Sequence, residues 1–145
     1  MSKSIDLGPH RVQLPEWISC SPYERYLGME ILEAADGLAV LTMPFNYELA
    51  QGAGLMHGGA LVSLADTAVV MAIKTILKPS THFVTMSMQS RFVAPVKEGV
   101  VTAKAEVARQ SDDMFTGSAI LYNGGEREVL RFDSVFKVIR GARKK

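Results

Sequence analysis

One long apolar segment limits the folds open to this chain more than any other feature. Residues 60–73 form an apolar run that only a serine, a threonine and Asp66 interrupt. A run this short, with polar side chains inside it, does not suit a membrane span. Leucines and alanines recur in it at spacings of three and four residues. We therefore expect one helix from Gly58 to about Leu77, buried in the protein core.

The remaining sequence supplies strands that could cover such a helix. Asp36-Gly37 stands between two β-rich runs, which is a pattern typical of a β-hairpin. Four more β-rich runs follow the helix: "HFVTMSMQSRFVAPV", "VVTAKAEVARQ", "FTGSAILYN" and "EREVLRFDSVFKVI". The short links between them favour a meander of four antiparallel strands. The prediction is an α+β fold, in which an antiparallel sheet of about six strands curls around one long central helix.

The two ends of the chain are expected to lie outside this unit. Residues 1–25 are predicted to form an N-terminal arm with a short helix, which Pro15 would open and Pro22 would break or kink. Residues 26–140 are predicted to form the single domain. Residues 141–145 are predicted to be a basic tail whose simplest role is solubility.

Charge and cysteine content limit the partners and the compartment. The 145 residues carry 16 basic and 15 acidic side chains, so the chain has no strong field that would attract nucleic acid or an anionic membrane. The single cysteine, Cys20, excludes an internal disulfide, and no apolar export segment opens the sequence. We expect a cytoplasmic protein that binds neither nucleic acid nor membrane.

Several familiar catalytic motifs are absent from the sequence. It contains no G-x-S-x-G, C-x-x-C or H-E-x-x-H pattern, and its three histidines are far apart. No metal site and no cofactor are predicted. Cys20, near the N-terminus, is interpreted as a passive thiol.

Two features near the start of the predicted helix indicate chemistry. Gly58-Gly59 falls where the first backbone N–H groups of a helix lack acceptors, a position that attracts negative charge. A junction that needs unusual dihedral angles would explain the same glycines. Asp66 lies two turns further on, where burial would raise its pKa and suit a base or a nucleophile. Hydrogen bonds from Ser63 or Thr67 would instead make it structural.

The spacing of these two features predicts a site shared between two chains. Eight residues of helix separate Gly58 from Asp66 by about 12 Å along the axis and about 80° around it. One carbonyl group cannot contact both. If the central helices of two chains lie side by side and antiparallel, each site takes its N–H donor from one chain and its carboxylate from the other.

The pattern formed by Gln51, His57-Gly58-Gly59 and Asp66 resembles that of the hotdog-fold acyl-CoA thioesterases, in the PaaI-like and 4-hydroxybenzoyl-CoA thioesterase branch. The resemblance covers about residues 26–140. It implies hydrolysis of an acyl-CoA thioester to a free acid and CoA, without a metal or cofactor. It also implies a homodimer or a tetramer made of two dimers.

The resemblance also implies roles for single residues. The Gly58 N–H would polarise the thioester carbonyl, Asp66 would act as nucleophile or as base on water, and Gln51 would help to position the thioester or the water. Thr85 aligns with a hydroxyl residue that orients water in some relatives. His57 is interpreted as shaping the helix start rather than as a general base. Four further residues are assigned as substrate contacts: Gly59, Met56, Arg91 and Arg109.

One turn departs from the family pattern. Many relatives carry a glycine and a basic residue between the fourth and fifth strands, whereas this chain reads "QSDDMF" there. Asp112 and Asp113 would repel the CoA phosphates. Arg109, Arg140, Arg143 or the terminal lysines would then have to hold them, or a different thiol carrier would replace CoA.

Two other functions compete with hydrolysis, and the sequence argues against both. A non-catalytic acyl-CoA sensor on the same fold would need neither Asp66 nor Gln51. A dehydratase would be expected to show a histidine and an acid in a different arrangement. The acyl group is not specified, because methionines such as Met43 and Met71 suit a core as well as a pocket.

Overall fold

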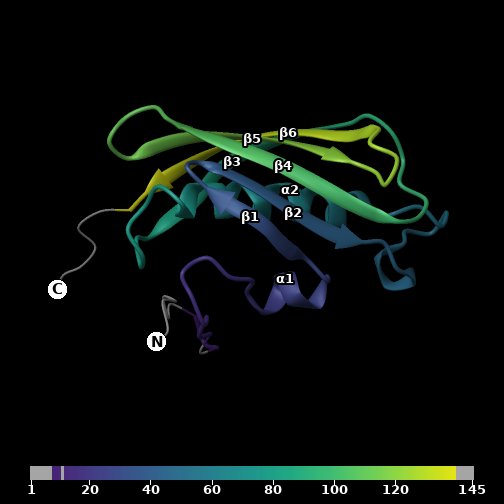
Figure 1. Ribbon diagram of the computed structural model, residues 1–145, viewed down its shortest axis with the longest axis horizontal. Coiled ribbons are helices and arrows are strands. Elements are labelled where there is room, and N and C mark those ends of the chain that lie inside the picture. The colour runs from purple at the N-terminus through teal and green to yellow at the C-terminus, as the bar shows by residue number, and fades with distance from the viewer. Residues whose placement is uncertain (1–7, 11, 140–145) are drawn as a thin grey trace.

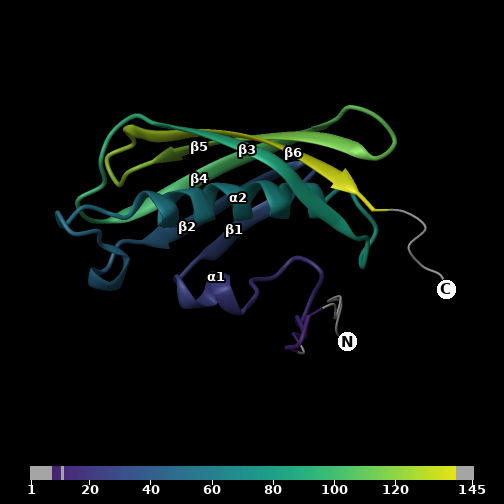
Figure 2. The same ribbon diagram turned by 180° about the vertical axis from the view of Figure 1, so that it is seen from behind.

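The computed structural model describes residues 8–10 and 12–139 and shows a six-stranded antiparallel sheet curved around one long helix (Figures 1 and 2). The strand order across the sheet is β1-β2-β4-β5-β6-β3. This architecture confirms the predicted fold. The elements are α1 (Pro22–Tyr26), β1 (Glu30–Ala35), β2 (Leu38–Pro44), the 3-10 helix η1 (Tyr47–Leu49), α2 (Gly58–Lys74), β3 (Phe83–Phe92), β4 (Val100–Arg109), β5 (Met114–Tyr122) and β6 (Glu128–Val138).

The first two strands form the predicted hairpin. Asp36 and Gly37 connect them and have positive φ angles of 54° and 80°. Positive φ at both central residues is the geometry of a two-residue turn that matches the twist of the strands, and Asp-Gly adopts it readily. The local sequence therefore determines this part of the fold.

The central helix α2 begins at Gly58 as predicted but ends at Lys74, three residues before the expected end. The Thr75 hydroxyl donates to the Ala72 carbonyl at 2.6 Å and accepts from the Gly37 N–H at 2.7 Å. This side chain thus ties the helix end to the β1–β2 turn. Among the described residues, no helix is long and apolar enough to cross a membrane.

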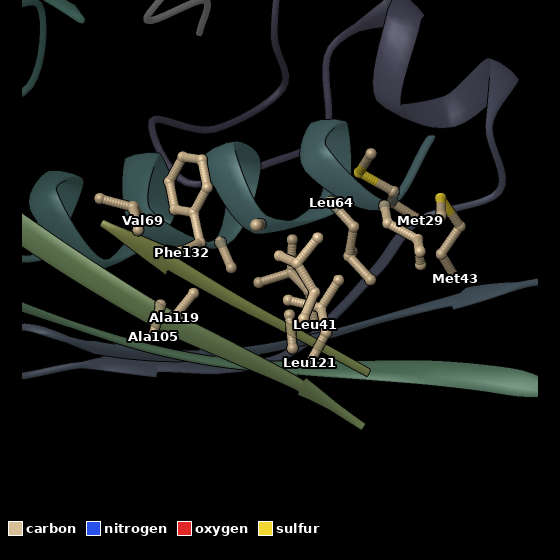
Figure 3. Packing of buried hydrophobic residues seen from close by; sticks show 14 of the residues in the cluster. Met29, Leu41, Met43, Leu64, Val69, Ala105, Ala119, Leu121 and Phe132 are labelled. Carbon is tan, nitrogen blue, oxygen red and sulfur yellow. The ribbon is translucent and has the colours of Figure 1, made fainter. Parts of the chain in front are cut away.

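The core lies between α2 and the concave face of the sheet. Figure 3 shows Leu64 of α2 above Leu41 and Leu121, and the ring of Phe132 reaching the helix from β6. Each large side chain buried in this way contributes about 1.5–3 kcal/mol. A Cβ at Gly117 would lie only 2.2 Å from Cγ1 of Val69, so this glycine lets the helix approach β5.

The helix α1 begins at Pro22, which corrects the expectation that a helix opens at Pro15 and breaks at Pro22. Proline suits the first position of a helix because its missing N–H would have no partner there. Ser21 is the N-cap, and its backbone N–H donates to Oε1 of Glu24 at 2.8 Å. Pro22 is therefore a start signal rather than a breaker.

The segment from Trp17 to α1 lies against the side of α2 that faces away from the sheet (Figures 1 and 2). We call residues 17–26 the strap. Nε1 of Trp17 donates to the Lys74 carbonyl at 3.0 Å, and Nζ of Lys74 donates to the Trp17 carbonyl at 3.0 Å. The hydroxyls of Tyr23 and Ser63 are hydrogen-bonded at 2.7 Å. The strap is thus fixed at both ends.

The predicted four-strand meander is wrong for β3. Strands β4, β5 and β6 do form a meander, but β3 pairs with β6 and forms an edge of the sheet. The link 93–99 is held down by Val96, which is buried and accepts a hydrogen bond from the Met56 N–H at 2.9 Å. The free edge of β3 carries exposed apolar side chains: Val84, Met86, Met88 and Phe92.

Candidate active site

At the start of α2, the two predicted N–H donors, Gly58 and Gly59, differ in whether they already have an acceptor. His57 is the N-cap, and its Nδ1 accepts from the Gly59 N–H at 2.8 Å. The His57 carbonyl accepts from the Ala60 N–H at 3.0 Å. The Gly58 N–H has no acceptor within the described part of the chain. The Gly58 N–H is therefore free within the described structure, whereas the Gly59 N–H is occupied.

The ring of Phe92 explains why residue 58 is a glycine. A Cβ at this position would lie 3.0 Å from Cε2 and 3.2 Å from Cζ of Phe92. Phe92 ends β3 and is 56% exposed, so an exposed ring at the end of this strand packs beside Gly58. No local sequence pattern indicates this contact, because 34 positions separate the two residues.

Gln51 lies in the loop before α2, on the same side of the molecule as Gly58. Its side-chain oxygen accepts from the N–H groups of Ala53 and Leu55 and so braces the loop. Its amide nitrogen has no hydrogen-bond partner among the residues that the structure describes. Gln51 also borders a surface hollow of about 770 Å³, together with Tyr47. The side chain thus has donors available at this hollow, whose lining does not include Gly58.

Asp66 is half-buried on the side of α2 that faces away from the sheet. Its Oδ1 has no hydrogen-bond partner in the described structure. Burial raises the pKa of this carboxyl, the negative charge of Glu24 raises it further, and a hydrogen bond with the Thr85 side chain lowers it. The hydroxyl of Ser63 instead donates to the Gly59 carbonyl at 2.9 Å. The alternative in which Ser63 makes Asp66 structural therefore has no support.

Thr85 on β3 is brought to Asp66, as the family resemblance implies. Glu24 was not predicted as part of this region, and no local pattern links positions 24 and 66. The carboxylate of Asp66 is thus bordered by β3 on one side and by the strap on the other. The predicted structural role of His57 at the helix start agrees with its capping contact.

The structure does not bring the other assigned substrate contacts to Asp66. Nη1 of Arg109 donates to the Asp112 carbonyl at 3.0 Å, so its guanidinium covers the β4–β5 turn. Arg91 is exposed on β3, and strand alternation directs it away from the Phe92 face. Met56 is 4% exposed and belongs to the hydrophobic core, so packing alone accounts for a methionine at this position. Residues 140–145, which include Arg140 and Arg143, lie outside the described residues.

We predict that His57→Ala lowers the free energy of unfolding by about 1 kcal/mol, because it removes the side-chain acceptor at the N-cap. His57→Asn keeps an acceptor and serves as the matched control. Thermal or denaturant unfolding of both variants gives the comparison. A general-base role would show instead as an equally large loss of kcat in both variants.

Comparisons with known proteins show the family to which this chain is similar. Residues 53–130 match a family model described as the thioesterase superfamily. A putative esterase, ComA2, of Bacillus subtilis is 36% identical over 81 residues, which cover 55% of this chain and 64% of that protein. The acyl-coenzyme A thioesterase PaaI of Escherichia coli K12 is 30% identical over 107 residues, which cover 73% of this chain and 74% of that protein.

Solved structures show the same fold. The E. coli PaaI structure has a TM-score of 0.74 and 27% identity, over 82% of this chain and 85% of that chain. A conserved protein of Pseudomonas aeruginosa has a TM-score of 0.80 and 25% identity, over 86% of this chain and 98% of that chain. The chain spans less than two thirds of the length of ComA2.

Proposed function

Because the chain belongs to the thioesterase superfamily, we propose that it hydrolyses an acyl-CoA thioester to a free acid and CoA. The observation that carries this proposal is that α2 holds two unsatisfied polar groups. One is the free Gly58 N–H, and the other is the half-buried carboxyl of Asp66, which has an unpartnered oxygen. The name of the E. coli relative PaaI supports acyl-CoA as the substrate class. A sensor would need neither Asp66 nor Gln51.

The proposed mechanism begins with the Gly58 N–H donating to the thioester carbonyl oxygen. This donor stabilises the negative charge that develops as the carbonyl carbon becomes tetrahedral. Asp66 either attacks that carbon and forms an anhydride, which water then cleaves, or removes a proton from the attacking water. In both routes the carbon–sulfur bond breaks and the CoA thiolate leaves. Thr85 and Gln51 would position the water and the thioester.

The site in this proposal uses two chains. Gly58 and Asp66 lie on one unbroken helix, so the separation of about 12 Å along its axis holds. A second copy can bring its Gly58 to Asp66 if the two α2 helices pack antiparallel. The resulting assembly is a dimer with two equal sites, and each site has the carboxylate of one chain and the N–H of the other.

The edge strand β3 supports this arrangement. An unpaired edge with exposed apolar side chains favours pairing with another strand. If β3 pairs antiparallel with its copy over its full length, Phe83 faces Phe92 of the partner subunit, and paired residue numbers sum to 175. Thr85 then lies opposite Ser90 of the partner subunit, two residues from Phe92 of the partner subunit. Strand pairing therefore brings the Asp66 end of one chain to the Gly58 end of the other.

The experiment that tests the activity is a panel of acyl-CoA substrates with detection of the released thiol. At least one acyl-CoA is expected to release CoA faster than the enzyme-free reaction does. Tight binding of acyl-CoA without thiol release across the panel would identify a sensor. This panel also establishes which acyl group the site accepts.

We predict that Asp112→Lys lowers KM for acyl-CoA, if the nucleotide of CoA passes the β4–β5 turn. The turn is acidic, and the Arg109 guanidinium is already bound to its carbonyls. This decrease in KM should become smaller as the salt concentration rises, because screening weakens the attraction between exposed charges. Glu33→Lys makes the same charge change on β1 and serves as the control. An unchanged KM at low salt would place the nucleotide elsewhere.

A further inference from the structure

We propose that Glu24 is a positioning residue for Asp66: the strap, which is hydrogen-bonded to α2 before and after Asp66, holds the Glu24 carboxylate on the side of the helix that carries Asp66. This inference rests on the proposed function, in which ionised Asp66 is the reactive group. Glu24 lies outside the residues 53–130 that match the family model. Its role would therefore be a property of the N-terminal segment of this chain.

The contacts of the strap bracket Asp66 along α2. Tyr23 is bound to Ser63, three residues before Asp66, and Trp17 is bound to Lys74, eight residues after it. Residues three or four apart lie on neighbouring turns of one side of a helix, so Ser63 lies on the Asp66 side, whereas Lys74 lies about 12 Å further along the axis and about 80° around it. The strap therefore crosses α2 at the level of Asp66, and Glu24 directly follows the anchored Tyr23.

The position of the Glu24 carboxylate is fixed by the N-cap of α1. Its Oε1 accepts from the Ser21 N–H at 2.8 Å, so the side chain is not a freely rotating surface group. Nη1 of Arg25 donates to the Cys20 carbonyl at 2.9 Å and further braces this turn. A carboxylate held in this way keeps a defined position relative to α2.

The groups that act on Asp66 come from two elements. Burial has the largest effect and raises the pKa of Asp66; Glu24 on the strap raises it further, and the Thr85 hydroxyl on β3 lowers it. The same Glu24 charge raises the pKa of Lys74, which burial lowers. Thr85 and Glu24 thus act in opposite directions on one carboxyl. Their balance decides how strong a base Asp66 is when it ionises.

Glu24→Gln is the variant that tests this role. Glutamine keeps the side-chain oxygen that caps Ser21 but removes the charge, so the acidic limb of the kcat/KM profile should move to lower pH. On that limb kcat/KM should rise by roughly two- to fivefold, the range of a partly screened like-charge pair. Glu24→Asp keeps the charge and should restore the wild-type profile. Glu30→Gln removes a charge that acts on Cys20 but not on Asp66, and it should leave the profile unchanged.

Two further measurements separate this proposal from its alternatives. Trp17, the only tryptophan, packs against Lys74 with Nζ 4.7 Å from the ring centroid, so its fluorescence reports whether the strap stays in place. An unchanged emission spectrum in Glu24→Gln is expected. A red-shifted spectrum would assign the change to release of the strap and overturn a role for the charge.

The second measurement follows the Asp66 carboxyl carbon by NMR during a pH titration of wild type and Glu24→Gln. A titration midpoint at lower pH in the variant is expected, and it would support the Glu24 role even if no acyl-CoA were hydrolysed. An active enzyme in which neither the rate profile nor this midpoint moves would overturn the Glu24 role and leave the thioesterase proposal standing.

Discussion

Asp66→Asn is expected to lose most of kcat for thioester hydrolysis while keeping the fold. Asparagine has nearly the same shape but cannot act as the nucleophile or as the base. Loss of a positioned proton-transfer group costs on the order of 10²- to 10⁴-fold in rate. Steady-state kinetics with thiol detection gives kcat and KM separately, and KM should change much less than kcat. Near-normal turnover would make Asp66 a structural residue.

A stability measurement controls for misfolding of this variant. Because burial raises the pKa of Asp66 in the folded state, the folded protein binds this proton more tightly than the unfolded chain does. Ionised Asp66 therefore lowers the free energy of unfolding. This loss begins in the ordinary carboxyl pH range and grows as the pH rises through the raised pKa that Asp66 has in the folded protein. Asp66→Asn removes this effect, so its melting temperature near pH 7 should equal or exceed that of wild type. The difference should narrow as the pH falls to the ordinary carboxyl range.

Local sequence was sufficient to predict the elements whose geometry depends on near neighbours. The hairpin follows from Asp36-Gly37, which adopts positive φ at both positions. The central helix follows from apolar residues at helical spacing, which is also why its start at Gly58 was predictable. These features depend on residues close to one another in the chain.

Features that depend on distant contacts were not predictable in the same way. The end of α2 at Lys74 depends on the Thr75 hydroxyl, which binds the Gly37 N–H 38 positions away. The edge position of β3 depends on pairing with β6, which begins 36 positions after β3 ends. The short links between the strands favoured a meander in which β3 lies next to β4. In the structure β3 instead lies next to β6, at the edge of the sheet that curves around α2.

The candidate site shows the same division. Gly58 and Asp66 stood out in the sequence, because a helix start and a carboxylate in an apolar helix are local features. Only the family resemblance distinguished Gly58 from Gly59, because the difference between their N–H groups depends on Nδ1 of His57. Glu24 was missed because its relation to Asp66 exists only when the strap lies across α2.

Two inactive variants refolded together are expected to recover about a quarter of wild-type activity. One parent is Asp66→Ala, which lacks the carboxylate. The other combines Gln51→Ala with Gly58→Leu, whose side chain would also collide with the ring of Phe92. After random reassembly about half of the dimers are mixed, and each mixed dimer has one intact site and one site with both lesions. A quarter of all sites are then intact.

This mixing experiment tests the shared site directly, since neither parent can regain activity alone. Mass spectrometry should confirm that mixed dimers form, and each parent refolded alone gives the background. A site shared between two chains predicts recovery close to one quarter, with the KM of the wild-type enzyme. Mixed dimers that remain as inactive as the parents would show that Gly58 and Asp66 of one chain serve the same site, and would contradict the two-chain mechanism.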